Sequence, residues 1–382
     1  MPIETVILLG AGASAAEGAP LQANLFREYF EALHGRRPGR SFLQEMNREL
    51  ESFFNLFFGL DVKSPDIAEM DFPTFEEALG VLELALQRGE SFRSVETFLR
   101  TNHETRSAQS WLQQVRENLI FLICLILEWT IKETRDKKNG CHGQLMQSLQ
   151  QSGDLEKTSF LSINYDILID DALTDLVSTY DLDYGVEFTN FDSPDDWRRP
   201  QPGRAIFLAK LHGSLNWLYC PACTRLTLTP RDGAVILLKL APKDCYCPPP
   251  CSSSTVPIVI PPTFFKVMTN FHLQQVWRKA EDHLMAAKRL VFCGYSLPDA
   301  DMHIKYLLKR VEVNRSTPVE VYIVNNHPDK EPSQQREEER RYRRLFRERN
   351  RVHYTTLSFA DFAAGGLALL DQSETAKAIS AS

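Results

Sequence analysis

The chain has 382 residues, of which 43% are hydrophobic and 24% are charged, and its formal net charge at pH 7 is −7. Such a chain can bury a sizeable core, and we expect one main domain with insertions. The acidic balance argues against a general nucleic-acid coat. The N-terminus leads almost directly into a strand and lacks the features of a signal peptide. We therefore expect a cytoplasmic protein whose eight cysteines are reduced thiols or metal ligands.

Five short apolar runs each end in a polar turn, and they cover residues 6–14, 159–166, 207–214, 290–296 and 321–326. Runs of this kind are typical of strands buried on both faces of a parallel sheet. The sequence thus predicts an α/β fold, with a Rossmann-like parallel sheet and helices on both faces. The polar ends of parallel strands emerge at one sheet edge, where open α/β folds bind ligands. The side chains expected to converge there are Gly12, Ser14, Asn164, Asp166, His212, Ser296 and Asn325.

The glycine turn after the first run is the first chemical signal. Residues 10–15 read Gly-Ala-Gly-Ala-Ser-Ala, which fits the G-x-G-x-x-(G/A) pattern between a strand and a helix. Such a turn lets the backbone and the following helix N-terminus approach a pyrophosphate, but a tight strand–helix turn without a ligand gives the same pattern. A dehydrogenase would place a second strand with an acidic end about 20 residues later. Here a helix and a basic loop follow, which disfavours hydride transfer.

Residues 35–155 show no clear strand pattern and predict a helical insertion. One helix would place Phe75, Ala78, Leu79, Leu82 and Leu86 on one face, and a second would run from about Trp111 to Ile131. The longest apolar run, residues 119–127, is too short to span a bilayer, so we expect a buried helix and no membrane contact. A structural lid or an oligomer contact is the favoured role for the insertion, ahead of direct substrate contact.

Two further strand ends carry polar residues that allow more than one interpretation. Asn164 and Asp166 could bind a ligand, or they could cap the helix that follows. His212, which precedes Gly213, could be a core imidazole with satisfied hydrogen bonds. Its predicted place at the same sheet edge as Asn164 favours an acid/base group instead.

The fourth run closes with a glycine–hydroxyl turn, Gly294-Tyr295-Ser296, that can hold a second phosphate. An acidic side chain beside it, such as Asp301, can accept ribose hydroxyls. The alternative is that Asp299 or Asp301 caps the next helix.

A cysteine cluster lies between the third and fourth runs. Cys220-x-x-Cys223 and Cys247-x-x-x-Cys251 suit a tetrahedral zinc site, although Cys245 makes five cysteines for four positions. A metal-free loop and a redox dithiol are the alternatives. With four protein ligands the site would be structural.

The C-terminal stretch 336–354 is locally basic. It predicts an amphipathic helix with Tyr342, Leu345 and Phe346 facing inward and its charges solvated, followed by an edge strand and a helix. We therefore expect no direct sequence-specific binding of nucleic acid.

The expected organisation has four parts: a main domain, a helical module, a small cysteine-rich module resembling a zinc ribbon, and a flexible tail. The main domain comprises residues 1–34, 156–217 and 256–370, and the helical module comprises residues 35–155. The cysteine-rich module comprises residues 218–255, and the tail comprises residues 371–382.

The order of these motifs resembles the sirtuin superfamily. GAGAS, SINYD, LHGS, the cysteine cluster, GYSLPDAD and IVNN follow one another as in its bacterial sirtuin-like (silent-information-regulator-type) branch, which is found in antiphage systems that deplete NAD+. The resemblance covers about residues 5–30 and 156–365. It implies an NAD+ hydrolase that yields nicotinamide and ADP-ribose and acts as a gated effector of abortive infection.

The resemblance also implies roles for individual residues. Ala11, Gly12 and Ser14 would cradle the NAD+ pyrophosphate. Asn164 would contact the nicotinamide ribose and help place the attacking water. Asp166 would hold the carboxamide of nicotinamide.

At the other strand ends, the resemblance makes His212 the general base and Gly294 and Ser296 the second phosphate-binding turn. Asn325 would lie near the adenine ribose. Asp301 matches an acidic position of the bacterial branch. A structural zinc ion held by the cysteines is part of the same resemblance.

Departures from the deacylating sirtuins favour hydrolysis. Residues 17–25 lack the arginine that follows the glycine turn in those enzymes, and residues 256–266 lack their phenylalanine–glycine–glutamate segment that pairs with the acyl-lysine peptide. The alternatives are an NAD+ or ADP-ribose sensor without turnover, an ADP-ribosyltransferase, and, less favoured, a protein deacylase. The bacterial branch further implies a homo-oligomer and a partner in trans, such as a HerA-type ATPase or an Argonaute-like protein.

Overall fold

The computed structural model describes residues 2–21, 24–34, 41–135, 140–176, 180–190, 197–229, 246–260, 270–299, 301–327 and 330–370. Cys245 and the tail expected at 371–382 lie outside these residues. The chain divides into two compact units, and each is described separately. Unit 1 comprises Met1–Ala19, Ile131–Ile260 and Val267–Ser382, and unit 2 comprises Pro20–Thr130 and Pro261–Lys266.

A seven-stranded sheet forms the centre of unit 1, and every pair of neighbouring strands in it is parallel. Its order is β11-β10-β9-β1-β2-β5-β3. The five apolar runs supply β1, β2, β5, β9 and β10, as predicted. The strands are β1 (Thr5–Leu9), β2 (Thr158–Ser162), β3 (Asp181–Asp183), β5 (Ala205–Lys210), β9 (Arg289–Cys293), β10 (Glu320–Val324) and β11 (Val352–Tyr354).

The register brings the carboxyl ends of the central strands into line. Thr5 of β1 pairs with Thr158 of β2 and Arg289 of β9, and Leu9 ends opposite Ser162 and Cys293. All five residues of β1 are buried, which explains why its sequence shows no alternation of polar and apolar residues. The turns after these strands therefore meet at one edge of the sheet.

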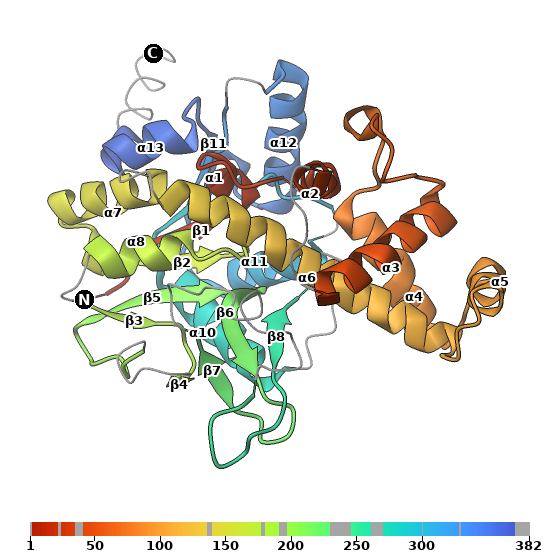
Figure 1. Ribbon diagram of the computed structural model, residues 1–382. Helices are drawn as coiled ribbons and strands as arrows, with labels where there is room; N and C mark the ends of the chain where they lie inside the picture. The colour runs from red at the N-terminus through yellow and green to blue at the C-terminus, as the bar shows by residue number, and fades with distance from the viewer. Residues whose placement is uncertain are drawn as a thin grey trace. The chain divides into compact units, whose positions relative to one another are not determined.

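Helices of unit 1 cover both faces of the sheet, as predicted, with α7 and α8 on one face and α10 and α11 on the other (Figure 1). The helices are α1 (Ala11–Ala15), α7 (Cys141–Ser152), α8 (Leu168–Leu176), α10 (Phe271–Ala286), α11 (Met302–Asn314), α12 (Pro332–Leu345) and α13 (Phe359–Gly365), with short 3₁₀ turns at Leu155–Lys157 and Arg349–Arg351. One expectation needs correction. The pattern after the glycine turn predicts a single helix with Leu21 and Leu25 on its apolar face, but the helix after β1 ends at Ala15, and Leu21 lies outside any helix and is 42% exposed.

The basic C-terminal stretch folds as predicted. Tyr342 of α12 is fully buried, Phe346 is buried just after the helix, and Leu345 packs partly against the core. β11 then forms an edge of the large sheet, and α13 follows it.

A second, smaller sheet of unit 1 has the order β4-β7-β6-β8. Its strands are β4 (Thr189–Asn190), β6 (Gly213–Tyr219), β7 (Leu226–Leu228) and β8 (Val256–Val259). Trp217 of β6 packs edge-on against Tyr184 and Phe188, with ring centroids 5.5 and 5.2 Å away. This aromatic contact joins the small sheet to the core of unit 1.

The described part of unit 2 consists of helices joined by turns and loops, as expected for the insertion. It contains α2 (Leu25–His34), α3 (Ser41–Phe58), a 3₁₀ turn (Ile67–Glu69), α4 (Phe75–Arg88), α5 (Arg93–Thr101) and most of α6 (Ala108–Arg135). Thr74 and Glu77 form a capping box at the start of α4. By length and composition, Ala108–Leu127 could cross a membrane, but 67% of its apolar window is buried, which favours a core helix.

Aromatic side chains form the core of unit 2. Phe26 and Phe54 meet edge-on at 4.8 Å, and Phe54 also contacts Phe30 at 5.4 Å and Phe53 at 5.3 Å. Much of the apolar content of the insertion is therefore used inside the unit.

Gly213 fixes the turn between His212 and β6. Its φ is +81°, and an added Cβ would lie 2.0 Å from the carbonyl oxygen of Ile258. We predict that Gly213→Ala lowers the free energy of unfolding by about 2 kcal/mol or more, from backbone strain and this clash together. Urea denaturation would measure the change.

Gly203→Ala is the matched control, because Gly203 has a φ of +79° and nothing within 4 Å of an added Cβ. Its destabilisation should be clearly smaller. Equal losses for the two variants would contradict a steric role for the Ile258 carbonyl.

Candidate functional site

The turns that follow β1 and β9 pack directly against each other. The Gly12 N–H donates to the Gly294 carbonyl oxygen at 2.8 Å, and the Gly10 N–H donates to that of Cys293 at 2.9 Å. Gly294 has a φ of +63°, and an added Cβ there would lie 2.0 Å from the backbone nitrogen of Ala13. Packing alone thus explains the glycines. Because the Gly12 N–H is already bonded, the predicted pyrophosphate contact would have to use other groups of this turn, in which Ala11 is exposed.

Three of the predicted residues form one hydrogen-bonded cluster between β1 and β2. The Ser14 hydroxyl donates to Oδ2 of Asp166 at 2.6 Å and accepts from Nδ2 of Asn164 at 2.8 Å. Nδ2 of Asn164 also donates to the Gly10 carbonyl at 2.8 Å. Ser14 and Asp166 are buried, whereas Asn164 is half-buried. The structure therefore holds these side chains in one fixed arrangement.

Asp166 has a second partner that bears on the alternative interpretation. Its Oδ1 accepts from the backbone N–H of Leu168 at 3.2 Å, at the start of α8. Asp166 thus caps this helix, as the alternative foresaw, and contacts Ser14 with its other oxygen.

His212 lies in the turn between β5 and β6 and is buried. Its ring centroid is 6.4 Å from that of Tyr165, the residue between Asn164 and Asp166. The backbone joins the two turns as well, because the Leu215 N–H donates to the Tyr165 carbonyl at 2.9 Å. The predicted general base and the predicted ribose contact therefore belong to turns that touch.

Asn325 reaches the same edge from β10. An added Cβ on Gly12 would lie 3.2 Å from its Oδ1, and its Nδ2 donates to Oε1 of Glu338 at 2.8 Å. Asp301 lies differently from the expectation of an open ribose contact. It is buried at the N-cap position of α11, makes no capping bond, and accepts from the Tyr295 hydroxyl at 3.1 Å. Ser296 is half-buried beside them.

Sequence reasoning missed two buried lysines next to the predicted residues. The ammonium group of Lys210 donates to the Asp166 carbonyl, and that of Lys330 donates to the Asn325 carbonyl at 2.8 Å. For Lys210 a signal existed, since it is a charge inside an apolar run. Nothing in the local sequence marks Lys330 or its buried partner Glu338.

The four best-spaced cysteines come together at the end of the small sheet. The sulfur atoms of Cys220, Cys223, Cys247 and Cys251 all lie within 4.8 Å of one another. The Cys220–Cys251 and Cys223–Cys247 distances of 3.7 and 3.6 Å are close to the ~3.8 Å expected for thiolates around tetrahedral Zn²⁺. Hydrogen bonds with Ser253 lower the pKa of Cys251 to about 6, whereas burial and the neighbouring thiols raise the pKa of Cys247, so the geometry of the four sulfur atoms carries the argument for a metal. The cluster fits a structural zinc ion.

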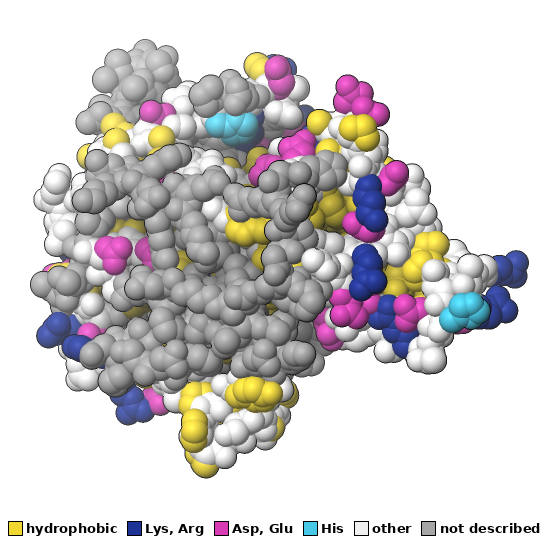
Figure 2. All heavy atoms as spheres, viewed as in Figure 1, with side chains coloured by type: hydrophobic (Ala, Val, Ile, Leu, Met, Phe, Trp, Pro, Cys, Tyr) yellow, Lys and Arg dark blue, Asp and Glu magenta, His cyan; other side chains and the backbone are white. Residues whose placement is uncertain are grey.

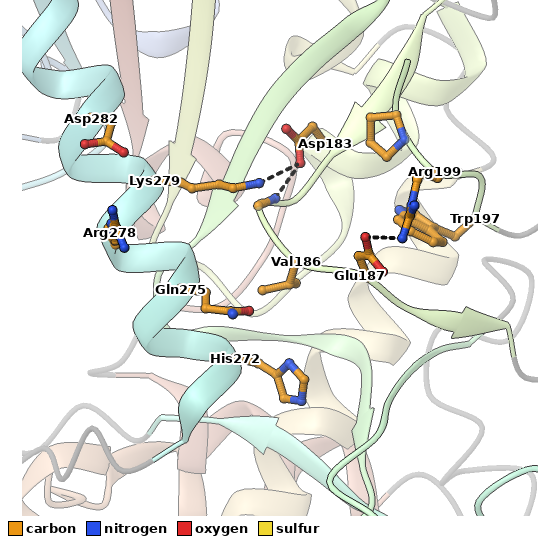
Figure 3. A pocket seen from close by; sticks show the side chains of 12 residues that line it. Asp183, Val186, Glu187, Trp197, Arg199, His272, Gln275, Arg278, Lys279 and Asp282 are labelled. Carbon is orange, nitrogen blue, oxygen red and sulfur yellow. Dashed lines mark hydrogen bonds and ion pairs between the residues drawn. The ribbon is translucent and has the colours of Figure 1, made fainter. Parts of the chain in front are cut away.

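A cavity of about 770 Å³ lies between α10 and residues 183–187 and 197–200, and none of the predicted site residues lines it (Figure 3). Its walls carry as many acidic as basic side chains, and Lys279 reaches Asp183 at 3.9 Å. A cavity with this balance has no net charge to attract a phosphate-bearing ligand.

One comparison with known proteins identifies a family. A family model described as a SIR2-like domain matches residues 158–350. Among solved structures, Sir2Tm bound to a propionylated peptide is similar at 14% identity and a TM-score of 0.39, over 98% of this chain and 94% of that one. A Sir2–p53 peptide–NAD⁺ complex is similar at 15% identity and a TM-score of 0.37, over 97% and 94%. A comparison with curated proteins found no match.

We predict that the purified protein contains about one zinc ion per chain, held by the four clustered thiolates. Replacing Cys220 and Cys223 by serine should lower stability, because structural zinc binding is coupled to folding. Four thiolates leave no open coordination position for a catalytic water. The folded fraction of the variant should therefore keep the NAD⁺ cleavage that the sequence predicts. Elemental analysis and thermal unfolding would measure both effects.

Cys141→Ser, outside the cluster, controls for the loss of a thiol. Less than about a tenth of an equivalent of zinc, in protein prepared without chelator, would mean that packing alone holds the loop.

Proposed function

Because this chain belongs to the SIR2-like family, we propose that it is an NAD⁺ glycohydrolase that cleaves NAD⁺ to nicotinamide and ADP-ribose. The proposal rests chiefly on the Asn164–Ser14–Asp166 cluster, whose hydrogen bonds of 2.6 and 2.8 Å fix three side chains at the carboxyl edge of the sheet. Ligands of open α/β sheets bind at that edge. His212 lies in the adjoining turn.

The chemistry of the reaction matches these residue types. Breaking the bond between C1′ of the ribose and the nicotinamide nitrogen builds positive charge on the ribose, while nicotinamide leaves as a neutral molecule. The reaction therefore needs no strong acid for the leaving group. It gains from a fixed ribose geometry, a group that recognises the carboxamide, and a base near C1′. We assign these roles to Asn164, Asp166 and His212.

Among alternative acceptors for the ADP-ribosyl group, we favour water over an acyl-lysine peptide. The part of residues 256–266 that the structure describes is β8, which pairs antiparallel with β6 inside the small sheet. β8 therefore already uses one of its edges within the protein. Residues 261–266 lie outside the described part of the chain. A sensor without turnover, an ADP-ribosyltransferase and a deacylase become outcomes of the test below.

We further propose that the activity is gated, because unrestrained NAD⁺ cleavage would kill the cell that makes the enzyme. The proposed setting is abortive antiphage defence in the cytoplasm, with a homo-oligomer and a partner in trans of the HerA-type ATPase or Argonaute-like kind. In unit 2, Val81 and Leu84 of α4 are 38% and 37% exposed and offer an apolar contact. Figure 2 shows acidic and basic side chains intermixed on the visible face of this unit. That mixture suits a protein partner better than nucleic acid.

Asn164→Ala and His212→Ala should each lower NAD⁺ turnover by about 100-fold or more, since each removes a group that acts on the reacting ribose. Chromatography of NAD⁺, nicotinamide and ADP-ribose would measure the change, and circular dichroism would check folding. Ser159→Ala is the control, because its bond to His283 lies away from the sheet edge.

If the folded wild type, with any activating partner present, consumes no NAD⁺, the proposal of a hydrolase is wrong. Stoichiometric binding without turnover would identify a sensor. Label transferred to a macromolecule, or consumption of NAD⁺ only with an acylated peptide, would identify a transferase or a deacylase.

Gating predicts that turnover depends on assembly. Replacing Val81 and Leu84 by glutamate should reduce both the oligomer and the rate, because charge on an apolar contact disfavours association. Light scattering after size exclusion, with the NAD⁺ assay on each fraction, would test this. A fully active monomer would contradict the gating proposal.

A further inference from the structure

Lys210, the last residue of β5, has a fully buried side chain. Its ammonium group donates to the backbone carbonyl of Asp166 and lies 3.2 Å from Oδ2 of Asp170. The other oxygen of Asp170 accepts from the Tyr184 hydroxyl at 2.6 Å. Burying an ion pair costs free energy, and apolar residues of similar size often serve stability as well or better. Stability alone therefore does not account for this lysine.

The position of the ammonium group links it to the proposed reaction. The carbonyl it holds belongs to Asp166, whose carboxylate bonds Ser14, and Asn164 lies two residues earlier in the same turn. Along its own strand, Lys210 lies two residues before His212. The next residue, Leu211, donates its N–H to the carbonyl of Ser162 at 2.9 Å. Lys210 thus ties together the carboxyl ends of β2 and β5, which carry all the proposed catalytic side chains.

We propose that Lys210, paired with Asp170, is a positioning residue for NAD⁺ cleavage, which sets the turn of Asn164 and Asp166 against His212. This inference rests on the proposed function. Lys210 has no exposed surface and acts through the backbone carbonyl of Asp166.

A second buried lysine, at the end of β10, provides a matched comparison. Lys330 donates to the Asn325 carbonyl at 2.8 Å and pairs with Glu338 at 2.6 Å, and Glu338 also accepts from the Asn325 side chain at 2.8 Å. Both lysines hold a strand-end carbonyl and a buried carboxylate. They differ in the strand end they hold. Lys210 holds the end of β2, which carries Asn164, whereas Lys330 holds the end of β10, where the family resemblance places Asn325 near the adenine ribose.

The two lysines should therefore affect different kinetic constants. Lys210→Met should lower kcat by about 100-fold with a much smaller change in KM, because it disturbs the reacting end of the substrate. Lys330→Met should raise KM by about 10-fold and change kcat less, because it disturbs a part of the substrate that does not react.

A double variant separates positioning from stability. Lys210→Met leaves Asp170 buried without its ion partner, so this variant should unfold at a lower temperature. Adding Asp170→Asn removes the unpaired charge and keeps an acceptor for Tyr184, so stability should recover. The turn would still lack its ammonium donor. We therefore expect kcat to stay low in the double variant, and recovery of kcat together with stability would overturn the inference.

A binding experiment keeps the test independent of turnover. By titration calorimetry, Lys210→Met should weaken binding of a carbocyclic, uncleavable NAD⁺ analogue by only a few-fold, in line with its small effect on KM. It should weaken binding of ADP-ribose less, because ADP-ribose lacks the nicotinamide that Asp166 is assigned to hold. Lys330→Met should weaken both ligands equally. If the wild type binds the analogue but never cleaves NAD⁺, the proposed function fails and the positioning inference is still decided by this comparison. Equal weakening of both ligands by Lys210→Met would overturn it.

Discussion

At the carboxyl end of β1, the Gly12 N–H donates to the Gly294 carbonyl at 2.8 Å, so the turns of two neighbouring strands share one hydrogen bond. The approach is so close that an added Cβ on Gly12 would lie 2.8 Å from Cα of Gly294. Ser14 is two residues beyond this contact on one side, and Asn325 follows the next strand on the other. The candidate site depends on this contact, because it sets how far apart the strand ends that carry Ser14 and Asn325 lie.

The site is built in two layers. Side chains at the sheet edge, such as Asn164 and Asn325, are half-buried and can meet a ligand. Behind them, ammonium groups neutralise buried carboxylates and hold the backbone carbonyls of the edge. Exposed ion pairs contribute little to stability because water screens them, whereas buried ones are expensive to form and fix geometry where they do form. The placement of the two lysines agrees with a role in geometry.

Sequence patterns predicted the parts of the fold that depend on local chemistry. Short apolar runs define strands buried on both faces, and cysteine spacing defines the four-cysteine cluster, because each pattern reports burial or close approach directly. The partners of buried polar groups were not predictable in this way. Glu338 belongs to a helix rich in arginine and glutamate, so nothing local distinguishes it from the solvated charges around it.

Two expectations drawn from composition meet a competing use of the same residues. Unit 2 was expected to serve as a lid or an oligomer contact, and that role stays a prediction; residues such as Phe54 fill the unit's own aromatic core. The glycine turn suggested phosphate contacts, but two of its N–H groups are used in contacts between strand ends. In both cases the residue types correctly indicated that something packs closely against them. They did not indicate whether the packing partner is another part of the same chain or a separate molecule.

The strand order has a consequence for how this protein is made. β1 leaves the ribosome before its two neighbours in the sheet, which begin only at Thr158 and Arg289. Pairings between segments this far apart form late. At about 5–20 residues per second, synthesis takes some tens of seconds to progress from Ser14 to Asn325. For all that time the nascent chain has no complete candidate site. If the chain cleaves NAD⁺ as proposed, that activity can begin only after the last of these strand ends has been made.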